Sequence, residues 1–508
     1  MKIFYIVVMK GVVSPAKRYT VSMSKKILIP LLLWLIAVGV YHVYKPLPED
    51  LQYVSAVELV PASDVHFFRD TTYIDAAGVR QSEQHIFDEI FRMIAESEQY
   101  VLIDMFLFND LLGAATTSYR QISKELTDAL VAKKQTSSST IVQVITDPIN
   151  TIYGGVESTQ LDALAAAGVT VVLTDLTQLR DSNPLYTALW RTFGQWWGNS
   201  TDPGYLPNPF ASQGQKLGVR TYLRLLNFKA NHRKVVLTDY NQNGDSGFST
   251  LVTSANPHDG SSAHSNVAIR VDNALWRDVL KTESAVAELS GATLVQPTHM
   301  SVMPVTAATE NTLQVQLLTE EAIKQRILSE INVLEAGDSL DIAMFYLAER
   351  DVVYALRQAD QRGATLRLLL DPNKDAFGRE KGGVPNRQVA HELMSESSGN
   401  TTVRWCYTTG EQCHSKMLMF SSGATTTLIQ GSANLTRRNI NGFNLETNLV
   451  IVGDSATRSL TEARQFFNQQ WNNQESRLAS VAYSEYADTS YLKTLRYRIM
   501  ELTGLSSW

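Results

Sequence analysis

Apolar and polar positions follow the same order in two long stretches of the chain. Each stretch opens with apolar residues at helical spacing, such as Ile86, Ile90 and Ile94, and continues into an apolar run of strand length. Helices and strands then alternate before two strands around a loop close the stretch. This order predicts an α/β fold with a mostly parallel sheet. The predicted helices span 84–98, 122–133, 320–335 and 351–361, and the predicted strands span 101–108, 142–147, 169–173, 340–347, 366–371 and 402–407.

The two stretches are internal repeats. Met105-Phe106 and Met344-Phe345 occupy matching places in the first predicted strand of each repeat, and an Asp-Pro pair ends the second strand. We therefore expect two pseudo-symmetric α/β/α halves packed together. The predicted parts are a first half over 64–290 with an aromatic insert over 185–210, a second half over 313–475, and a helical C-terminal tail over 476–508.

An uncharged, mostly apolar run over 27–44 precedes the repeats. Its length is close to the ~20 residues that a membrane-spanning helix needs. More Lys and Arg lie before the run than after it, so residues 1–26 are expected in the cytoplasm and the repeats outside it. A cleaved signal peptide and a buried core helix are the alternative interpretations. Met23 is an alternative start, because it would leave a short basic segment before the run.

Composition narrows the classes of function. The chain has 508 residues, with 45 Lys and Arg, 51 Asp and Glu, and a net charge of −6, which argues against a protein that binds nucleic acid over a broad basic surface. Cys406 and Cys413 are too few for a disulfide-rich scaffold or a thiolate zinc site. They would form a hairpin disulfide in an exported domain or stay free in a reducing compartment. Since no residues cluster at metal-ligand spacing, no metal and no cofactor are expected.

The strand pairs that close the repeats carry the candidate chemistry. The first pair contains His232 and Lys234, and the second contains His414 and Lys416. Residues two apart on a strand point to the same face, so each His and Lys would enter one pocket together. Imidazole, ammonium, hydroxyl and amide groups suit an anionic phosphodiester. The hydroxyl and amide groups come from the neighbouring strands, at Ser254, Asn256, Ser432 and Asn434.

These motifs resemble those of the phospholipase D superfamily, in which His-x-Lys-x4-Asp is followed by Gly-Ser-x-x-Asn or a close variant. The resemblance covers residues 64–475 and implies one active site at the junction, with one motif from each half and no metal. Asp239 completes the first motif, whereas Ser421 stands at that position in the second, and Thr253 replaces the usual Gly. Glu446 matches the family's acidic residue that orients a catalytic His. No carboxylate stands at the equivalent place in the first half, over 263–266.

The resemblance implies a two-step reaction through a phosphohistidine. His232 is expected to be the nucleophile because the N-terminal copy usually has that role, and His414, oriented by Glu446, is expected to be the general acid and base. The opposite assignment of the two histidines stays open. The expected catalytic residues are His232, Lys234, Asp239, His414, Lys416 and Glu446, and the expected substrate-binding residues are Ser254, Asn256, Ser432 and Asn434.

Several further residues have two interpretations. His258 and His264 either contact the pocket or have an ordinary structural role. The aromatic insert is either packed in the core or forms a lid or a surface at the membrane interface. The basic residues before and within the first motif are either a solvated strand face or a positive funnel for phosphate groups. They are Arg220, Arg224, Lys229 and Arg233.

The sequence therefore predicts a membrane-anchored, monomeric phosphodiesterase that acts on phospholipids, by hydrolysis or by phosphatidyl transfer to a small alcohol. Its predicted location is the inner membrane of the cell, with a single span and the catalytic domain in the periplasm or outside the cell. No nucleic-acid partner is expected. The alternatives are a cardiolipin synthase-like phosphatidyltransferase, a nuclease of the same superfamily, and an inactive scaffold on this fold.

Overall fold

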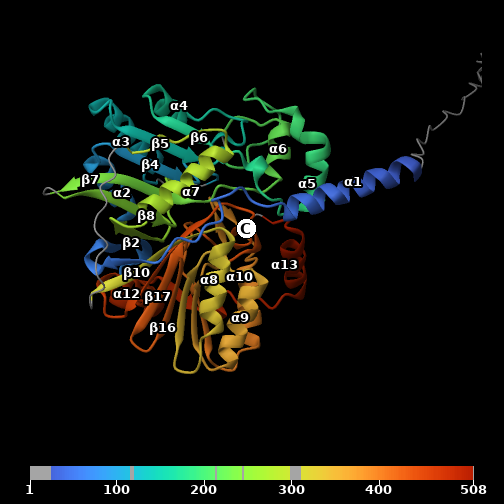
Figure 1. Ribbon diagram of the computed structural model, residues 1–508. Coiled ribbons are helices and arrows are strands. Elements are labelled where there is room, and N and C mark those ends of the chain that lie inside the picture. The colour runs from blue at the N-terminus through green and yellow to red at the C-terminus, as the bar shows by residue number, and fades with distance from the viewer. Residues whose placement is uncertain (1–24, 115–118, 212–213, 243–244, 298–310, 507–508) are drawn as a thin grey trace, which may run out of the picture.

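Two large β-sheets form the body of the protein in the computed structural model, which describes residues 25–114, 119–211, 214–242, 245–297 and 311–506 (Figure 1). The first sheet has the order β3-β2-β9-β8-β7-β4-β5-β6. Its strands are β2 (Val65–Ile74), β3 (Arg80–Gln84), β4 (Tyr100–Met105), β5 (Ile141–Thr146), β6 (Thr170–Leu173), β7 (Lys234–Gln242), β8 (Asp245–Thr253) and β9 (Asn266–Asp272).

The second sheet repeats this arrangement, with the order β1-β10-β18-β17-β16-β11-β12-β15-β19. In the two halves β4 corresponds to β11, β5 to β12, β6 to β15, β7 to β16, β8 to β17 and β9 to β18, so the predicted pseudo-symmetric α/β fold is confirmed. Its strands are β1 (Glu58–Pro61), β10 (Thr312–Thr319), β11 (Ser339–Met344), β12 (Thr365–Leu370), β15 (Thr401–Cys406), β16 (Lys416–Ser422), β17 (Thr425–Gly431), β18 (Thr447–Asp454) and β19 (Ser480–Ala482).

The prediction of mostly parallel sheets is wrong. In the first sheet β4, β5 and β6 pair in parallel, and in the second sheet β11, β12 and β15 do so, whereas every other pair of neighbouring strands is antiparallel. The physical reason is the connection between strands. Helical crossovers join the parallel strands, but β7–β8 and β16–β17 are hairpins, and a short turn can join only antiparallel strands.

Helices cover the outer faces of the two sheets. In the first half α2 (Ile86–Glu96) buries Ile86, Ile90 and Ile94 against the sheet, as the helical spacing predicted, together with α3 (Ile122–Thr136) and α4 (Thr159–Ala166). In the second half α8 (Glu321–Asn332), α9 (Arg350–Gln361) and α10 (Asn386–Ser395) have this place. A third apolar core joins both sheets through α7 (Trp276–Leu289) and α12 (Arg458–Asn472).

Chain segments cross between the halves at both ends of the repeats. β1 precedes the first half in sequence but pairs with β10 at the edge of the second sheet. The predicted tail over 476–508 contributes β19, which pairs with β15 beyond the expected limit of the second half, before α13 (Tyr491–Thr503). A disulfide joins Cys406, at the end of β15, to Cys413, directly before His414. Ile74 of the first half exchanges two backbone hydrogen bonds with Leu478 of the tail, at 3.1 Å and 2.8 Å, so segments from both ends of the chain join the two repeats.

One long apolar helix leaves this body at the N-terminus. α1 (Lys25–Tyr44) is, within the described residues, the one helix that is long and apolar enough to cross a membrane. It covers the predicted span over 27–44. Most of the predicted cytoplasmic segment over 1–26, including Met23, lies outside the described residues. A membrane anchor and a signal sequence both have this length and composition, and α1 suggests a membrane anchor.

Candidate active site

Both His-x-Lys motifs lie where their strands begin. Lys234 opens β7 and Lys416 opens β16, and each histidine stands two residues earlier. The Asp-Pro pairs explain how each motif is held. The Asn231 N–H donates to Asp147 Oδ2 at 2.7 Å, and the Cys413 N–H donates to Asp371 Oδ2 at 2.8 Å. Each aspartate therefore holds the residue immediately before a histidine.

Backbone pairing across the junction brings the two motifs together. The His232 N–H donates to the Leu445 carbonyl of the second half at 2.9 Å, and the His414 N–H donates to the Ser265 carbonyl of the first half at 2.9 Å. The charge of Lys234 in the first half acts on His414 in the second, so the two motifs share one electrostatic environment. The expectation of one site built from both halves agrees with this geometry.

The residues that orient the histidines also cross the junction. Glu446 Oε2 lies 2.9 Å from His232 Nδ1, so the prediction that Glu446 orients His414 is wrong. His414 Nδ1 instead lies 3.1 Å from Asn266 Oδ1, at the place where the first half lacks a carboxylate. The reason is that each loop carrying an orienting residue pairs with the motif strand of the opposite half. Both contacts leave the ring nitrogen Nε2 of each histidine available for chemistry.

Ser254 and Ser432 support these orienting residues. The Ser254 hydroxyl donates to Asn266 Oδ1 at 3.1 Å, and the Ser432 hydroxyl donates to Glu446 Oε2. Both serines are buried, and each hydroxyl also accepts a backbone N–H. The expected role as substrate donors therefore does not fit the geometry, because these hydroxyls are already engaged in positioning.

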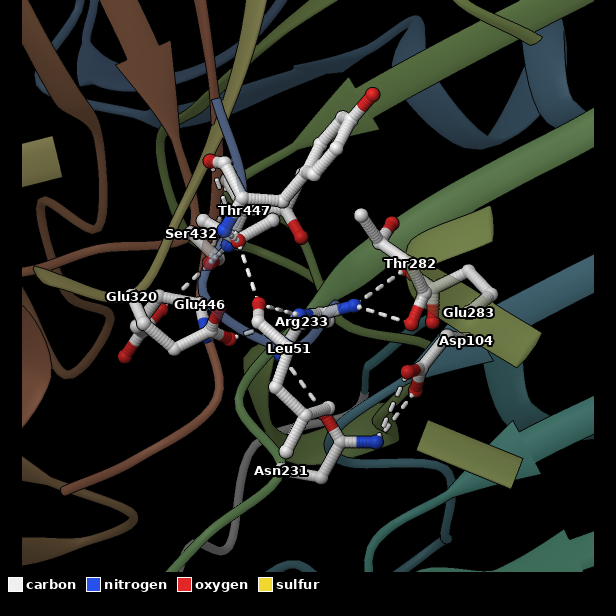
Figure 2. A network of polar contacts seen from close by, with 12 residues as sticks. Leu51, Asp104, Asn231, Arg233, Thr282, Glu283, Glu320, Ser432, Glu446 and Thr447 are labelled. Carbon is white, nitrogen blue, oxygen red and sulfur yellow. Dashed lines mark hydrogen bonds and ion pairs between the residues drawn. The ribbon is translucent and has the colours of Figure 1, made fainter. Parts of the chain in front are cut away.

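A buried ionic network lies behind His232, and Figure 2 shows it. Arg233 is buried between Glu283 and Glu320, at 3.1 Å and 2.8 Å, and Glu320 Oε1 also accepts the Glu446 N–H at 3.1 Å. Neither interpretation of Arg233, as a solvated strand residue or a phosphate funnel, is correct. Its guanidinium joins the first half to the loop that carries Glu446, so it braces the partner of His232.

The two lysines occupy matching environments. Lys234 Nζ donates to the His232 carbonyl at 2.7 Å, and Lys416 Nζ donates to the His414 carbonyl at 2.8 Å. Burial lowers the pKa of Lys234 to about 7, and burial together with the nearby charge of Lys234 holds the pKa of Lys416 well below its usual value. A bound anion would offset both effects, since it stabilises the charged ammonium groups.

Burial also keeps both histidines neutral at pH 7. It lowers the pKa of His232 to about 4, against the opposing effect of the Glu446 carboxylate. Burial lowers the pKa of His414 well below 6.5, and the charge of Lys416 acts in the same direction. A neutral imidazole has the free lone pair that nucleophilic attack needs. The site therefore holds two neutral imidazoles between two buried lysines.

The remaining predicted residues divide into two groups. Asn256 and Asn434 are almost fully buried near the motifs, and the side-chain oxygen of Asn434 has no hydrogen-bond partner in the described part of the chain. Asp239 lies five residues along β7 from Lys234, where it accepts the backbone N–H groups of residues 98–100. Asp239 is thus structural rather than catalytic, which explains why Ser421 can replace it in the second half.

Sequence reasoning missed the aromatic floor of the site. The Phe106 ring lies 4.7 Å from the His232 ring, and the Phe345 ring lies 5.0 Å from the His414 ring. Each Phe also lies beneath the lysine of the same half, at 5.1 Å and 5.3 Å. The signal was the matching Met-Phe pairs of the repeat, which we used only to set the register.

The site has hydrogen-bond donors for a phosphate group. Among the residues that the structure describes, no group of three or more His, Cys, Asp or Glu side chains could hold an ion. Lys234, Lys416 and the amides of Asn256 and Asn434 are instead suited to the oxygens of a phosphodiester.

A family model described as "Cardiolipin synthase, PLD-like domain" matches residues 327–471. This range contains the second His-x-Lys motif, and the first half repeats its strands and its motif. Residues 327–471 belong to the phospholipase D superfamily. Other members of this superfamily are phosphodiesterases and phosphatidyltransferases, and this member has the paired motifs in one chain. No match was found among curated protein sequences.

One solved structure supports the fold of this phospholipase D-like protein, and two others are similar at lower TM-scores. Phosphatidylserine synthase from Haemophilus influenzae Rd KW20 is similar with a TM-score of 0.53 and 10% identity, over 88% of this chain and 95% of that chain. Polyphosphate kinase from Porphyromonas gingivalis covers 87% of this chain and 53% of its own, with 16% identity and a TM-score of 0.44. Nuc from Salmonella typhimurium covers 33% of this chain and 97% of its own, with 17% identity and a TM-score of 0.27.

Proposed function

We propose that this protein is a membrane-anchored phosphodiesterase that acts on phospholipids through a phosphohistidine intermediate. The observation that carries the proposal is the pair of buried, neutral histidines, each oriented through Nδ1 by a residue of the opposite half. This arrangement presents two Nε2 atoms to one substrate. The buried lysines supply the positive charge that a diester anion needs when it leaves water.

In the first step His232 Nε2 attacks phosphorus, a P–N bond forms, and the bond from phosphorus to the leaving alkoxide breaks. When the diester binds, its anion raises the pKa of His414, the ring takes up a proton from solvent at Nε2, and it gives this proton to the leaving alkoxide. In the second step His414 takes a proton from water or an alcohol, whose oxygen attacks phosphorus as the P–N bond breaks. Glu446 suits His232 for attack, because a carboxylate stabilises the positive charge that the ring acquires.

Three observations support a phospholipid as the substrate. α1 is suited to hold the site at a membrane, the net charge of −6 disfavours nucleic acid, and the family model that matches the second half is named for cardiolipin synthase. That model also favours phosphatidyl transfer to an alcohol, in addition to transfer to water. We propose that the protein acts as a monomer, because one chain carries both motifs.

The proposed location is the inner membrane, with the body on the outer side of it. The lysines before α1 favour a cytoplasmic N-terminus. The Cys406–Cys413 disulfide supports the same placement, because disulfides persist in oxidising compartments.

The decisive experiment is a panel of phospholipids offered to the full chain in vesicles, with and without glycerol or phosphatidylglycerol as an acceptor. Mass spectrometry of the products distinguishes the two reactions, because hydrolysis yields phosphatidate and transfer yields a new phosphatidyl ester. Plasmid DNA serves as the comparison substrate. Cleavage of plasmid with no lipid turnover would replace the proposal with a nuclease, and no turnover of either would favour an inactive scaffold.

A further inference from the structure

The helix that leaves the body packs against the aromatic insert at its point of exit. Gly39 is the one buried residue of α1, and a Cβ at this position would lie 3.5 Å from Pro184 Cβ and 3.7 Å from Ala188 Cβ. The Asp181 N–H also donates to the His42 carbonyl at 2.9 Å. The start of the insert is therefore fixed against the last turns of α1, and the rest of α1 projects from the body (Figure 1).

The insert presents an apolar stripe to solvent. It is a continuous helical segment made of α5 (Pro184–Leu189), a π-helical turn (Trp190–Gly194) and a 3-10 turn (Gln195–Trp197). One face packs inward through Ala188 and Trp190. The opposite face exposes four large apolar side chains at spacings of four, four and three residues, and Trp196 is 76% exposed. We call them the insert stripe: Leu185, Leu189, Phe193 and Trp196.

A second stripe runs along α13 on the same side of the body (Figure 1). Tyr497 and Glu501 face inward, whereas the outer face exposes large apolar residues at spacings of three, four and three, and Leu502 is 81% exposed. We call them the tail stripe: Leu492, Leu495, Ile499 and Leu502. Gly504 ends the helix against the Ser182 carbonyl, directly before the insert, and the Arg437 guanidinium donates to the same carbonyl at 3.0 Å. The two stripes are thus joined at the base of the insert.

We propose that the insert stripe and the tail stripe form a membrane-docking face, which sits in the headgroup layer of the leaflet in which α1 ends. The occupant follows from continuity with α1, because a helix that spans the bilayer brings the face around its exit against the membrane surface. Exposed Leu, Ile and Phe side chains would then be removed from water. Exposed Trp196, Trp197 and Tyr491 are of the types that favour the interface.

Basic residues lie beside the tail stripe. Lys493, Arg496 and Arg498 belong to α13, where Lys493 pairs with Asp488 at 2.7 Å, Arg498 pairs with Glu392 at 2.9 Å, and Arg496 is exposed. This mixture of apolar and basic side chains on one helix favours an anionic leaflet. The inference extends the proposed function, because it states how the body meets the membrane that holds its substrate.

Nitroxide labels test the proposal in the full chain, reconstituted in vesicles of phosphatidylethanolamine and phosphatidylglycerol. Labels are attached at Leu189→Cys and Ile499→Cys, and at Val79→Cys as the control. Val79 is exposed in the turn that follows β2, and β2 lies on the side of the body away from α1 (Figure 1). We expect the two face labels to be accessible to oxygen and protected from a water-soluble nickel complex, and the control label to show the reverse.

The alternatives give different results. Face labels as open to nickel as the control would overturn the proposal. Spin–spin broadening at the face labels would indicate a second copy of the chain as the occupant and would overturn it too. This measurement needs no turnover, so it stands even if the proposed phospholipid activity fails.

A second test uses activity. Leu189→Glu and Ile499→Glu should lower turnover of vesicle lipid by about tenfold or more, because burying one such side chain is worth at least that factor. Turnover of a water-soluble diester should stay unchanged, and Val79→Glu should change neither. Unchanged turnover of vesicle lipid in both face variants would contradict the proposal, and so would equal losses on both substrates.

An independent observation concerns a third histidine in the site. His264 is buried, with its ring 5.7 Å from that of His414 and stacked at 6.1 Å on Phe377. Its Nδ1 lies 3.3 Å from the Gln412 N–H, which can only donate. Nδ1 is therefore unprotonated, and the neutral ring carries its proton on Nε2. That atom has no partner among the described residues, although it is buried.

We infer that His264 Nε2–H donates a hydrogen bond to a phosphate oxygen of the substrate beside His414. A buried donor without a partner is costly, and an anionic oxygen at this place would satisfy it. The inference rests on the proposed function for its substrate, but the donor itself follows from the geometry of the ring.

The test compares His264→Leu, which removes the donor, with His264→Gln, which keeps an N–H donor at similar reach. Binding of inorganic tungstate, as a phosphate mimic, is measured by calorimetry, and diester turnover is measured separately. We expect His264→Leu to weaken tungstate binding about tenfold and His264→Gln to restore it, since a hydrogen bond to a charged group is worth about this factor. The inference would be overturned if His264→Leu bound tungstate as tightly as the wild type, or if both variants lost tungstate binding equally. Tungstate binding without diester turnover would count only against the proposed function.

Discussion

The two site histidines face chemically different partners, a carboxylate at His232 and an amide at His414. A carboxylate stabilises an imidazolium ring, whereas an amide oxygen orients the ring without adding a charge. This difference favours His232 for the covalent step and His414 for proton transfer. The repeated motif alone contains no such asymmetry.

We expect His232→Ala and His414→Ala each to reduce turnover of a natural phospholipid at least about a hundredfold, because each removes one essential step. A diester with a p-nitrophenol leaving group separates their roles, since this group leaves without a proton. His414→Ala should then release about one equivalent of p-nitrophenol in a rapid burst, measured by stopped flow, and His232→Ala should not. A burst in His232→Ala alone would reverse the assignment.

Glu446→Gln tests the carboxylate through the pH profile. The Glu446 charge raises the pKa values of His232, at about 4, and of Lys234, at about 7. With the p-nitrophenyl diester, whose leaving group needs no proton from His414, His232 must be neutral and Lys234 charged, so kcat/KM should fall below about pH 4 and above about pH 7 in the wild type. Without the charge both pKa values decrease, so both limbs should move to lower pH.

The same substitution should lower kcat about 10- to 100-fold, as is usual for residues that orient a reactive group. Glu288→Gln, exposed on α7, is the control and should leave the profile unchanged. Unmoved limbs in Glu446→Gln would show that its charge does not act on these groups.

At the scale of elements, the start of each motif strand depends on an aspartate at the end of a parallel strand. Asp147 follows β5 and Asp371 follows β12, and each accepts the N–H that precedes a site histidine. The repeat therefore duplicates the supporting aspartate as well as the His-x-Lys motif.

We expect Asp147→Ala and Asp371→Ala each to lower the free energy of unfolding by about 1–3 kcal/mol, because each leaves a buried N–H without a partner. Turnover should fall more than tenfold as the histidine loses its position. Urea unfolding and kcat measure the two effects. Asp128→Ala, exposed on α3 in an ion pair with Lys124, should cost less than about 1 kcal/mol. Full activity in both aspartate variants would contradict the supporting role.

At the scale of the whole molecule, the topology is open to a direct test. Alkaline phosphatase fused after Trp508 folds only in an oxidising compartment, so we expect an active fusion and a protected Cys406–Cys413 bridge in alkylation assays. A fusion before Lys25 should be inactive. A stable but inactive C-terminal fusion would place the body in the cytoplasm.

Turnover should also be independent of divalent metal. Lys234 and Lys416 supply the positive charge that a metal would supply elsewhere. Dialysis against a chelator should therefore change kcat by less than about twofold, which is no more than a change in ionic strength would cause. Loss of activity that a divalent ion restores would contradict the proposed mechanism.

The sequence by itself determined the order of the elements, the repeat and the two motifs. These features depend on spacing along the chain: apolar residues at helical intervals predict α2, a continuous apolar run predicts β4, and His232 and Lys234 must share a strand face. The long apolar run likewise predicts α1 from length alone. Each of these inferences needs only neighbours in sequence.

The contacts between distant side chains and strands are seen only in the tertiary structure. Glu446 orients His232 rather than His414, Arg233 is buried against Glu320, and β1 joins the second sheet. Such contacts join segments far apart in the sequence, and packing between the halves selects them. A pseudo-symmetric repeat makes pairing within one half and pairing across the halves equally consistent with the sequence, so only the junction itself distinguishes them.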